Sequence, residues 1–157
     1  KFEIMRSKDE RTAIVDYAHS PDALKNVLTT IQEVRKKCQE LITVVGAGGD
    51  RDKTKRPKMA KIALQYSHTL VLTSDNPRTE NPETILDDMK EGINMQDEER
   101  VIRITDRKEA IRTACMMAGS GDIILVAGKG HETYQEVNEI RYHFDDREIL
   151  KEVLQNP

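Results

Sequence analysis

Residues 71–78, which read VLTSDNPR, decide the predicted fold. The β-branched and aliphatic residues favour a buried strand, and they lead directly into a turn that carries Asp75, Asn76 and Arg78. The sequence NPE at residues 81–83 is typical of a helix start, with an N-cap, a proline and an acid. The stretch therefore predicts a strand, a polar loop and a helix. In an open α/β sheet, such a loop lies at the carboxyl edge, where ligands bind.

The loop carries groups that suit the head group of an amino acid. Arg78 presents a planar fork for a carboxylate, whereas Asp75 and Asn76 can accept hydrogen bonds from an ammonium. Pro77 fixes its own φ and restricts the backbone of Asn76, which stiffens the loop. On the motif alone, an ordinary turn with solvated charges is the alternative.

Residues 12–20, TAIVDYAHS, predict a second strand that ends in a polar loop. Ser20 is the expected cap of the helix that follows. Asp16 lies where doubly wound folds often place an acid that binds a ribose, and His19 stands beside a helix N-terminus, which attracts anions. The alternative is that Asp16 and His19 only fasten the loop.

Two further apolar strands end in glycine-containing loops. The loop GAGGDRDK at residues 46–53 is neither of the common phosphate loops, because both the Gly-Lys-Ser/Thr ending and a third glycine at the helix start are missing. It suits a substrate better than a nucleotide. The strand expected at residues 122–127 is apolar from Ile123 onward, as expected for a strand covered on both faces, and leads into GKGHE at 128–132. There, Gly128 permits close backbone approach to a ligand, and Glu132 offers a partner for an ammonium; a flexible turn with a capping acid is the alternative.

Strands and helices alternate along the chain. Four strand–helix alternations predict an α/β, Rossmann-like, doubly wound, mostly parallel sheet with an antiparallel edge strand, in a single domain over residues 1–157. One or two final strands are expected within residues 136–144 and would supply that antiparallel edge. A short strand is expected at residues 1–5, and residues 94–100 read as a polar connector. Because all four polar motifs follow strand ends, we expect them to meet at one edge of the sheet.

Composition sets outer limits on function. The net charge of −3 gives no reason to expect nucleic acid or an anionic membrane as a partner, and no apolar run approaches the ~20 residues of a membrane span. Cys38 and Cys115 lack metal-ligand spacing and fit free thiols in a reducing, cytoplasmic compartment. The chain begins with Lys1, which we interpret as a sign that it is part of a longer protein.

The four motifs occur in this order in Mur ligases, and the chain resembles the C-terminal domain of that family over essentially its whole length. The motifs are residues 15–21, 48–52, 75–78 and 128–132. The resemblance implies a cytoplasmic, ATP-dependent amide ligase of peptidoglycan synthesis. ATP would activate a carboxyl of UDP-N-acetylmuramoyl-L-Ala-D-Glu as an acyl phosphate, which the amine of meso-diaminopimelate attacks. The resemblance also implies Mg²⁺, bound mainly by a central ATPase domain that, like the N-terminal UDP-binding domain, is absent from this chain.

The resemblance also assigns roles to individual residues. It implies a meso-diaminopimelate shell of Arg51, Asp75, Asn76, Arg78, Gly128 and Glu132. It implies that Asp16 and His19 lie at the ATP site, and it implies no catalytic residue and no metal ligand in this domain. Arg78 is the family's mark of selection for diaminopimelate over lysine. The isolated chain is expected to be inactive as a ligase.

Three alternatives remain open. A ligase of the same family that adds lysine is the nearest, although Arg78 argues against it. A free-standing amino-acid-binding module without catalysis would require the gene to encode this chain alone. A Rossmann-type oxidoreductase is suggested by the glycines of residues 46–49, but the third glycine of the dinucleotide pattern is missing.

Overall fold

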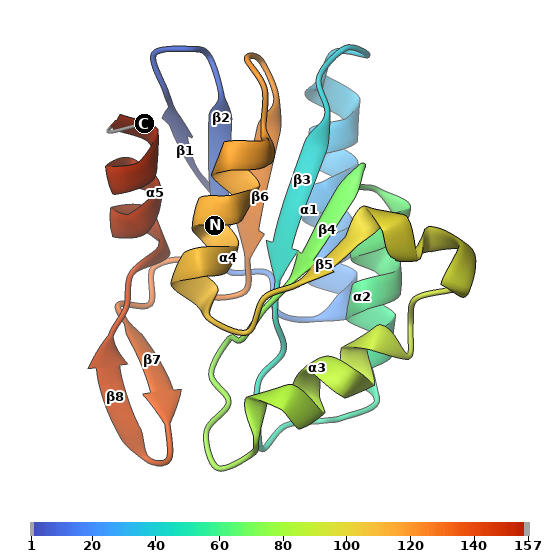
Figure 1. Cartoon of the computed structure of the whole chain (residues 1–157), viewed down its shortest axis with the longest axis vertical. Helices are drawn as coiled ribbons and strands as arrows, with labels where there is room; N and C mark the ends of the chain where they lie inside the picture. Colours follow the sequence, from blue (N-terminus) through green and yellow to red (C-terminus); the bar gives the residue numbers. More distant parts are fainter. Residues whose placement is uncertain (1, 156–157) are drawn as a thin grey trace.

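The main sheet has six strands in the order β1-β2-β6-β3-β4-β5 (Figure 1). Our computed structural model describes residues 2–155. The strands are β1 (Phe2–Arg6), β2 (Thr12–Asp16), β3 (Leu41–Val45), β4 (Thr69–Leu72), β5 (Val101–Arg103) and β6 (Ile123–Ala127). β1 is antiparallel to β2, and the other neighbours are parallel. The predicted doubly wound sheet with one antiparallel edge strand is therefore confirmed.

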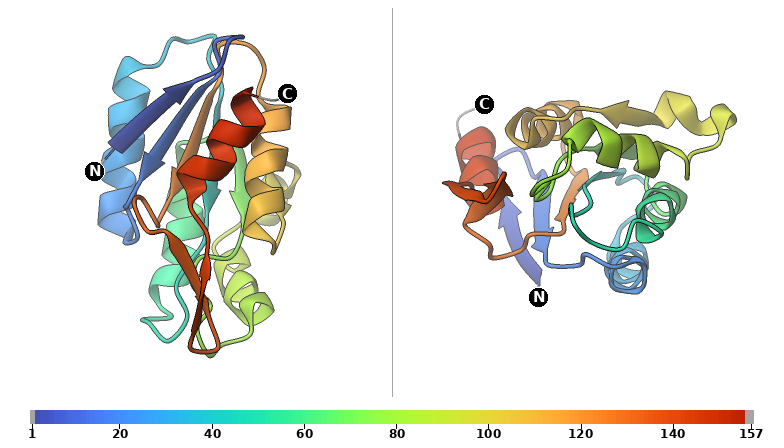
Figure 2. Two further views of the ribbon diagram at one scale, coloured as in Figure 1. Left: turned by 90° about the vertical axis from the view of Figure 1, so that its left-hand side faces the viewer. Right: turned by 90° about the horizontal axis from the view of Figure 1, so that it is seen from below.

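Helices cover both faces of this sheet (Figure 2). One layer contains α1 (Pro21–Val34), α2 (Lys55–Gln65) and α3 (Pro82–Lys90), and the other contains α4 (Arg107–Met117) and α5 (Asp146–Gln155). Side chains alternate between the two cores: Leu125 packs in the core that includes residues of α1 to α3, and its neighbour Val126 packs in the core of α4 and α5. This two-sided burial explains why β6 is apolar at every position.

The predicted helix caps are present. Ser20 Oγ accepts a hydrogen bond from the Ala23 amide at 3.2 Å, and Asn81 Oδ1 accepts one from the Glu83 amide at 2.9 Å. Asp106 caps α4 in the same way. Each cap satisfies an amide that the helix itself leaves unpaired.

The parallel strands end in one row. Asp16 lies opposite Ala127, Ala127 opposite Val45, and Val45 opposite Leu72 in the strand registers. The loops that follow these four residues therefore leave the sheet side by side. This register is what brings the four polar motifs together.

One prediction about the last strands was wrong in detail. The final strands, β7 (Tyr134–Val137) and β8 (Ile140–His143), form a separate two-stranded hairpin, so the antiparallel edge of the main sheet is β1. Every residue of β8 is exposed, which leaves that strand no apolar face to bury against the main sheet. The polar connector contains a 3₁₀ helix, η1 (Met95–Arg100). None of the helices in the described part of the chain is long and apolar enough to cross a membrane.

Candidate functional site

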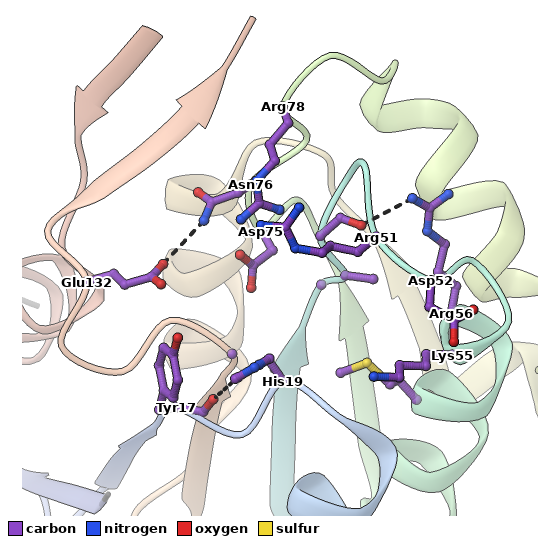
Figure 3. A pocket seen from close by; sticks show the side chains of 15 residues that line it. Tyr17, His19, Arg51, Asp52, Lys55, Arg56, Asp75, Asn76, Arg78 and Glu132 are labelled. Carbon is purple, nitrogen blue, oxygen red and sulfur yellow. Dashed lines mark hydrogen bonds between the residues drawn. The ribbon is translucent and has the colours of Figure 1, made fainter. Parts of the chain in front are cut away.

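A cavity of about 490 Å³ opens at the carboxyl edge of the sheet, between the ends of the strands, α2 and the β7–β8 hairpin (Figure 3). Seven of the eight predicted site residues line it: His19, Arg51, Asp75, Asn76, Arg78, Gly128 and Glu132. Asp16 does not line this cavity. The expectation that the four motifs meet is confirmed.

Asp75 is the most deeply placed carboxylate of the cavity. It is 7% exposed, and no described residue reaches its carboxylate with a hydrogen bond or an ion pair within 4 Å. Burial raises the pKa of Asp75, while the charges of Arg107 and Lys129 act in the opposite direction. Gly128, at φ +119°, lies so close that a Cβ there would be 2.5 Å from Asp75 Oδ2. Gly128 therefore belongs to the site because only a residue without a side chain leaves room for this carboxylate.

Arg78 extends across the top of the cavity from a strained backbone position, with φ at +52°. Its Nη1 donates to the Gly49 carbonyl at 3.0 Å, and its Nε lies 3.8 Å from Glu136 Oε1. The Arg78 amide donates to the Glu136 carbonyl, and the Asn138 amide donates to the Arg78 carbonyl. The hairpin thus pairs with the 75–78 loop, which explains how a non-glycine residue is held at positive φ. Arg51, by contrast, is exposed and donates only to the Asp50 carbonyl among the described residues.

Asn76 is oriented by its neighbours. Its Oδ1 accepts hydrogen bonds from Lys129 Nζ at 3.0 Å and from the Glu136 amide at 2.9 Å, so its Nδ2 faces Glu132 Oε1 at 3.3 Å. The two lone pairs of Oδ1 are therefore occupied. In this arrangement Asn76 orients Glu132 rather than offering its own oxygen to an ammonium.

A buried ion pair beneath the cavity was not anticipated from the sequence. Arg107 of α4 binds Asp146 of α5 through two hydrogen bonds of 2.8 Å, and neither side chain is exposed. The same guanidinium donates to the Ser74 carbonyl at 2.9 Å and the Ala127 carbonyl at 3.3 Å. It therefore ties together the ends of β4 and β6, just before the two loops that carry Asp75 and the 128–132 turn.

The basic residues at positions 53–58 divide into two kinds. Lys53, Lys55 and Lys58 are exposed, as is usual for a solvated face, whereas Arg56 is buried. Arg56 is 1% exposed and binds Glu80 at 2.6 Å, among other partners. The hydrogen bond from Arg56 is the main reason that the pKa of Glu80 falls to about 2. No periodicity signals this, because the partner lies on another loop.

The predicted nucleotide side of the cavity surrounds the start of α1. Asp16 is buried, and its Oδ2 accepts a hydrogen bond from the Ala18 amide at 2.8 Å. His19 donates from Nδ1 to the Tyr17 carbonyl at 2.8 Å and stacks edge-to-face on the Tyr17 ring. These bonds fasten the loop and leave Nε2 of His19 open toward the cavity (Figure 3). The roles of Asp16 and His19 toward ATP stay predictions.

No three His, Cys, Asp or Glu side chains among residues 2–155 come together as ligands for a metal ion. The expectation that Mg²⁺ is bound mainly outside this domain stays a prediction.

The fold and cavity define a class of protein: a doubly wound α/β domain with a cavity lined by charged side chains at the carboxyl ends of its strands. The model of the Mur ligase family, glutamate ligase domain, matches residues 2–130. The chain belongs to this family.

Relatives of similar sequence carry one name. A UDP-N-acetylmuramoyl-L-alanyl-D-glutamate–2,6-diaminopimelate ligase from Phocaeicola vulgatus is 56% identical over 156 residues, which is 99% of this chain and 32% of the relative. The enzyme of that name from Aquifex aeolicus is 49% identical to this chain over an alignment that covers 98% of this chain and 31% of the Aquifex protein. The chain thus spans about a third of the length of the curated relatives it matches.

Solved structures agree with the computed fold. A structure of a UDP-N-acetylmuramoyl-L-alanyl-D-glutamate–2,6-diaminopimelate ligase superposes with a TM-score of 0.90 at 46% identity, covering 98% of this chain and 31% of that one. A folylpolyglutamate synthase of Mycobacterium tuberculosis gives a TM-score of 0.58 at 20% identity over 80% of this chain and 28% of that one, which shows a shared fold alone.

Proposed function

We propose that this chain is the amino-acid-binding C-terminal domain of a ligase that adds meso-diaminopimelate to UDP-N-acetylmuramoyl-L-Ala-D-Glu in the cytoplasm. In the whole protein, ATP converts the D-glutamate carboxyl into an acyl phosphate, and the amine of meso-diaminopimelate displaces phosphate to form the amide bond. The names and identities of the relatives support this assignment.

The observation that carries the proposal is the state of Asp75. A carboxylate that is 7% exposed, and that forms no hydrogen bond or ion pair with the described side chains, would be stabilised by a cationic group of a ligand. Glu132 lines the same cavity, and Arg78 provides a guanidinium across from it. A ligand with an ammonium beside a carboxylate matches this arrangement of charges.

Charged groups of both signs surround the cavity. Asp75 and Glu132 line it together with Arg51 and Arg78, and the charges of Arg107 and Lys129 act on Asp75 from nearby. An amino acid, which carries both an ammonium and a carboxylate, suits such a lining better than a simple anion does.

The choice between diaminopimelate and lysine depends on a second carboxylate. Diaminopimelate ends in an ammonium and a carboxylate, whereas lysine ends in an ammonium alone. Arg78 and Arg51 can grip that carboxylate, and Asp75 and Glu132 can bind the ammonium. Lysine has no second carboxylate for the remaining donors of the Arg78 guanidinium and would therefore gain less from this residue.

Replacement of Arg78 tests the proposal. In the full-length protein, we expect Arg78→Ala to lower kcat/KM for meso-diaminopimelate by about 10- to 150-fold, since a hydrogen bond to a charged group contributes about 1.5–3 kcal/mol. The kcat/KM for lysine should change little, so the preference between the two amino acids shrinks.

The matched control is Arg6→Ala, which removes an exposed arginine of β1. This control should leave the preference intact. If Arg78→Ala keeps the original preference, the assignment of diaminopimelate is wrong; if the wild-type protein prefers lysine, the lysine-adding alternative replaces it.

A further inference from the structure

Lys129 is a fully buried lysine next to two residues that line the cavity. It lies in the turn between β6 and β7, and its side chain has no exposed surface. A buried ammonium is costly unless acceptors surround it. Here Nζ donates to three: Asn76 Oδ1 at 3.0 Å, Glu132 Oε1 at 3.2 Å and the Tyr134 carbonyl.

The three acceptors come from three different segments. Asn76 belongs to the loop after β4, Glu132 to the turn after β6, and Tyr134 to the first strand of the hairpin. Lys129 Nζ also lies 5.3 Å from the centre of the Tyr134 ring, within the range of a cation–π contact. One ammonium therefore fixes the relative position of all three segments.

Lys129 acts on the cavity through other residues. Asn76 and Glu132 line the cavity, whereas Lys129 does not. Lys129 and the Glu136 amide together occupy Asn76 Oδ1, so the amide turns its Nδ2 toward Glu132. Lys129 thus acts on the Glu132 carboxylate directly and also through Asn76. Both contacts are made to Oε1, and Oε2 forms no hydrogen bond with the described residues.

We propose that Lys129 is a positioning residue for the amino-acid substrate: it holds Glu132 so that the free oxygen of this carboxylate, together with Asp75, receives the ammonium of the ligand. The inference rests on the proposed function for the identity of that ligand. Lys129 itself contacts neither the ligand nor the reacting atoms. It determines where the negative charge of Glu132 lies.

Steady-state kinetics of the full-length protein test this role with Lys129→Met and Lys129→Gln. Met keeps the length of the side chain without the charge, and Gln keeps a hydrogen-bond donor should the Met variant not fold. We expect the KM for meso-diaminopimelate to rise at least about tenfold in both variants, with kcat and the KM for ATP within about threefold. Lys61→Met, which changes an exposed lysine of α2, is the matched control and should leave all three constants unchanged.

A double-mutant cycle separates positioning from a purely structural role. If Lys129 acts through Glu132, Lys129→Gln should raise KM much less in a Glu132→Gln background than in the wild type, because the carboxylate that it positions is already gone. Equal effects in both backgrounds, or an unchanged KM in Lys129→Gln alone, would overturn the proposal.

A crystal structure of the full-length Lys129→Gln protein distinguishes this inference from the proposed function. We expect the Glu132 carboxylate to move away from Asn76, and an unmoved carboxylate refutes the positioning role whatever the substrate is. Failure of the wild-type protein to use meso-diaminopimelate would overturn the proposed function, and the position of Glu132 in the variant would still decide the role of Lys129.

Discussion

Arg56 shows how one buried side chain stabilises the rim of the cavity. Its guanidinium binds Glu80, which precedes α3, and Asp88, which lies within α3. It also donates to the Gly48 carbonyl in the loop after β3. The loop that carries Arg51 and the segment that follows Arg78 are therefore held together at one point. The stability of this rim should depend on the ionisation of Glu80.

The first prediction at this scale concerns acid. The pKa of Glu80 is about 2 in the folded chain against 4.5 in its ordinary state, chiefly because Arg56 donates to it. A carboxylate with a lowered folded pKa stabilises the fold above pH 4.5, and this contribution is lost as the pH falls toward about 2. Glu80→Gln should lower the free energy of unfolding at neutral pH and flatten its decline over this window, as measured by urea unfolding at a series of pH values.

Glu33→Gln, at an exposed position of α1, is the control for this experiment and should follow the wild-type curve. Parallel curves for Glu80→Gln and the wild type would show that the Arg56 pair contributes no pH-dependent stability.

Individual residues also show what the sequence can and cannot predict. Asp75, Arg78 and Glu132 were predictable as lining residues because each follows a strand end, and strand ends share an edge. Lys129 and Arg107 were not predictable as buried, because their partners come from distant segments, and no local pattern marks a charged side chain that will be covered.

At the scale of elements, α4 and α5 are joined by the Arg107–Asp146 pair. The pair stands at the first residue of each helix, and both side chains are wholly buried. An acid at the start of a helix also lies favourably in the field of the helix. The pair fixes the two helices to the ends of β4 and β6, which hold the ligand loops.

Replacing one partner of this pair should lower the free energy of unfolding far more than replacing both partners with apolar residues. Asp146→Asn leaves an uncompensated buried guanidinium, and we expect it to lower the free energy of unfolding by about 3–5 kcal/mol in urea titrations. The double change Arg107→Met with Asp146→Leu should recover part of that loss, because no charge is then left unpaired. Glu152→Gln, an exposed position on α5, serves as the control.

A loss below about 1 kcal/mol for Asp146→Asn would mean that water or another group compensates Arg107, as at a surface pair. In that case the pair would not be the element that holds the loops.

Most elements were predictable because their signals are local. Ser20 and Asn81 cap helices where their sequence patterns indicated, and the apolar run of β6 marked a central strand. The hairpin was assigned to the wrong sheet, because alternation identifies a strand without identifying its partner. Its partner is the 75–78 loop, to which it is joined at Arg78 and Val137.

At the scale of the whole molecule, the chain gathers groups that suit an amino acid. It contains no Gly-Lys-Ser/Thr phosphate loop and spans about a third of the length of its relatives. Phosphoryl transfer depends on positioning the phosphates and neutralising their charge. If the proposed function holds, we expect regions that the relatives contain beyond the matched third to supply these functions.

We therefore predict that the isolated 157-residue chain forms no amide product from ATP, meso-diaminopimelate and the UDP-linked dipeptide. Product formation followed by liquid chromatography provides the measurement, with the full-length protein as the positive control. Turnover by the isolated chain would show that this domain carries its own phosphate site. The proposal that ATP is bound by other parts of the protein would then be wrong.

The pairing of the β7–β8 hairpin with the 75–78 loop has a consequence for engineering substrate choice. Glu136 and Asn138 hold the Arg78 backbone through hydrogen bonds, so the orientation of the guanidinium depends on the β7–β8 hairpin, about sixty residues further along the chain. Transferring residues 75–78 alone into a lysine-adding enzyme would add the Arg78 charge but not the hairpin contacts that orient its guanidinium. Exchanging both segments as one cassette is the smallest graft that carries the geometry along with the residue.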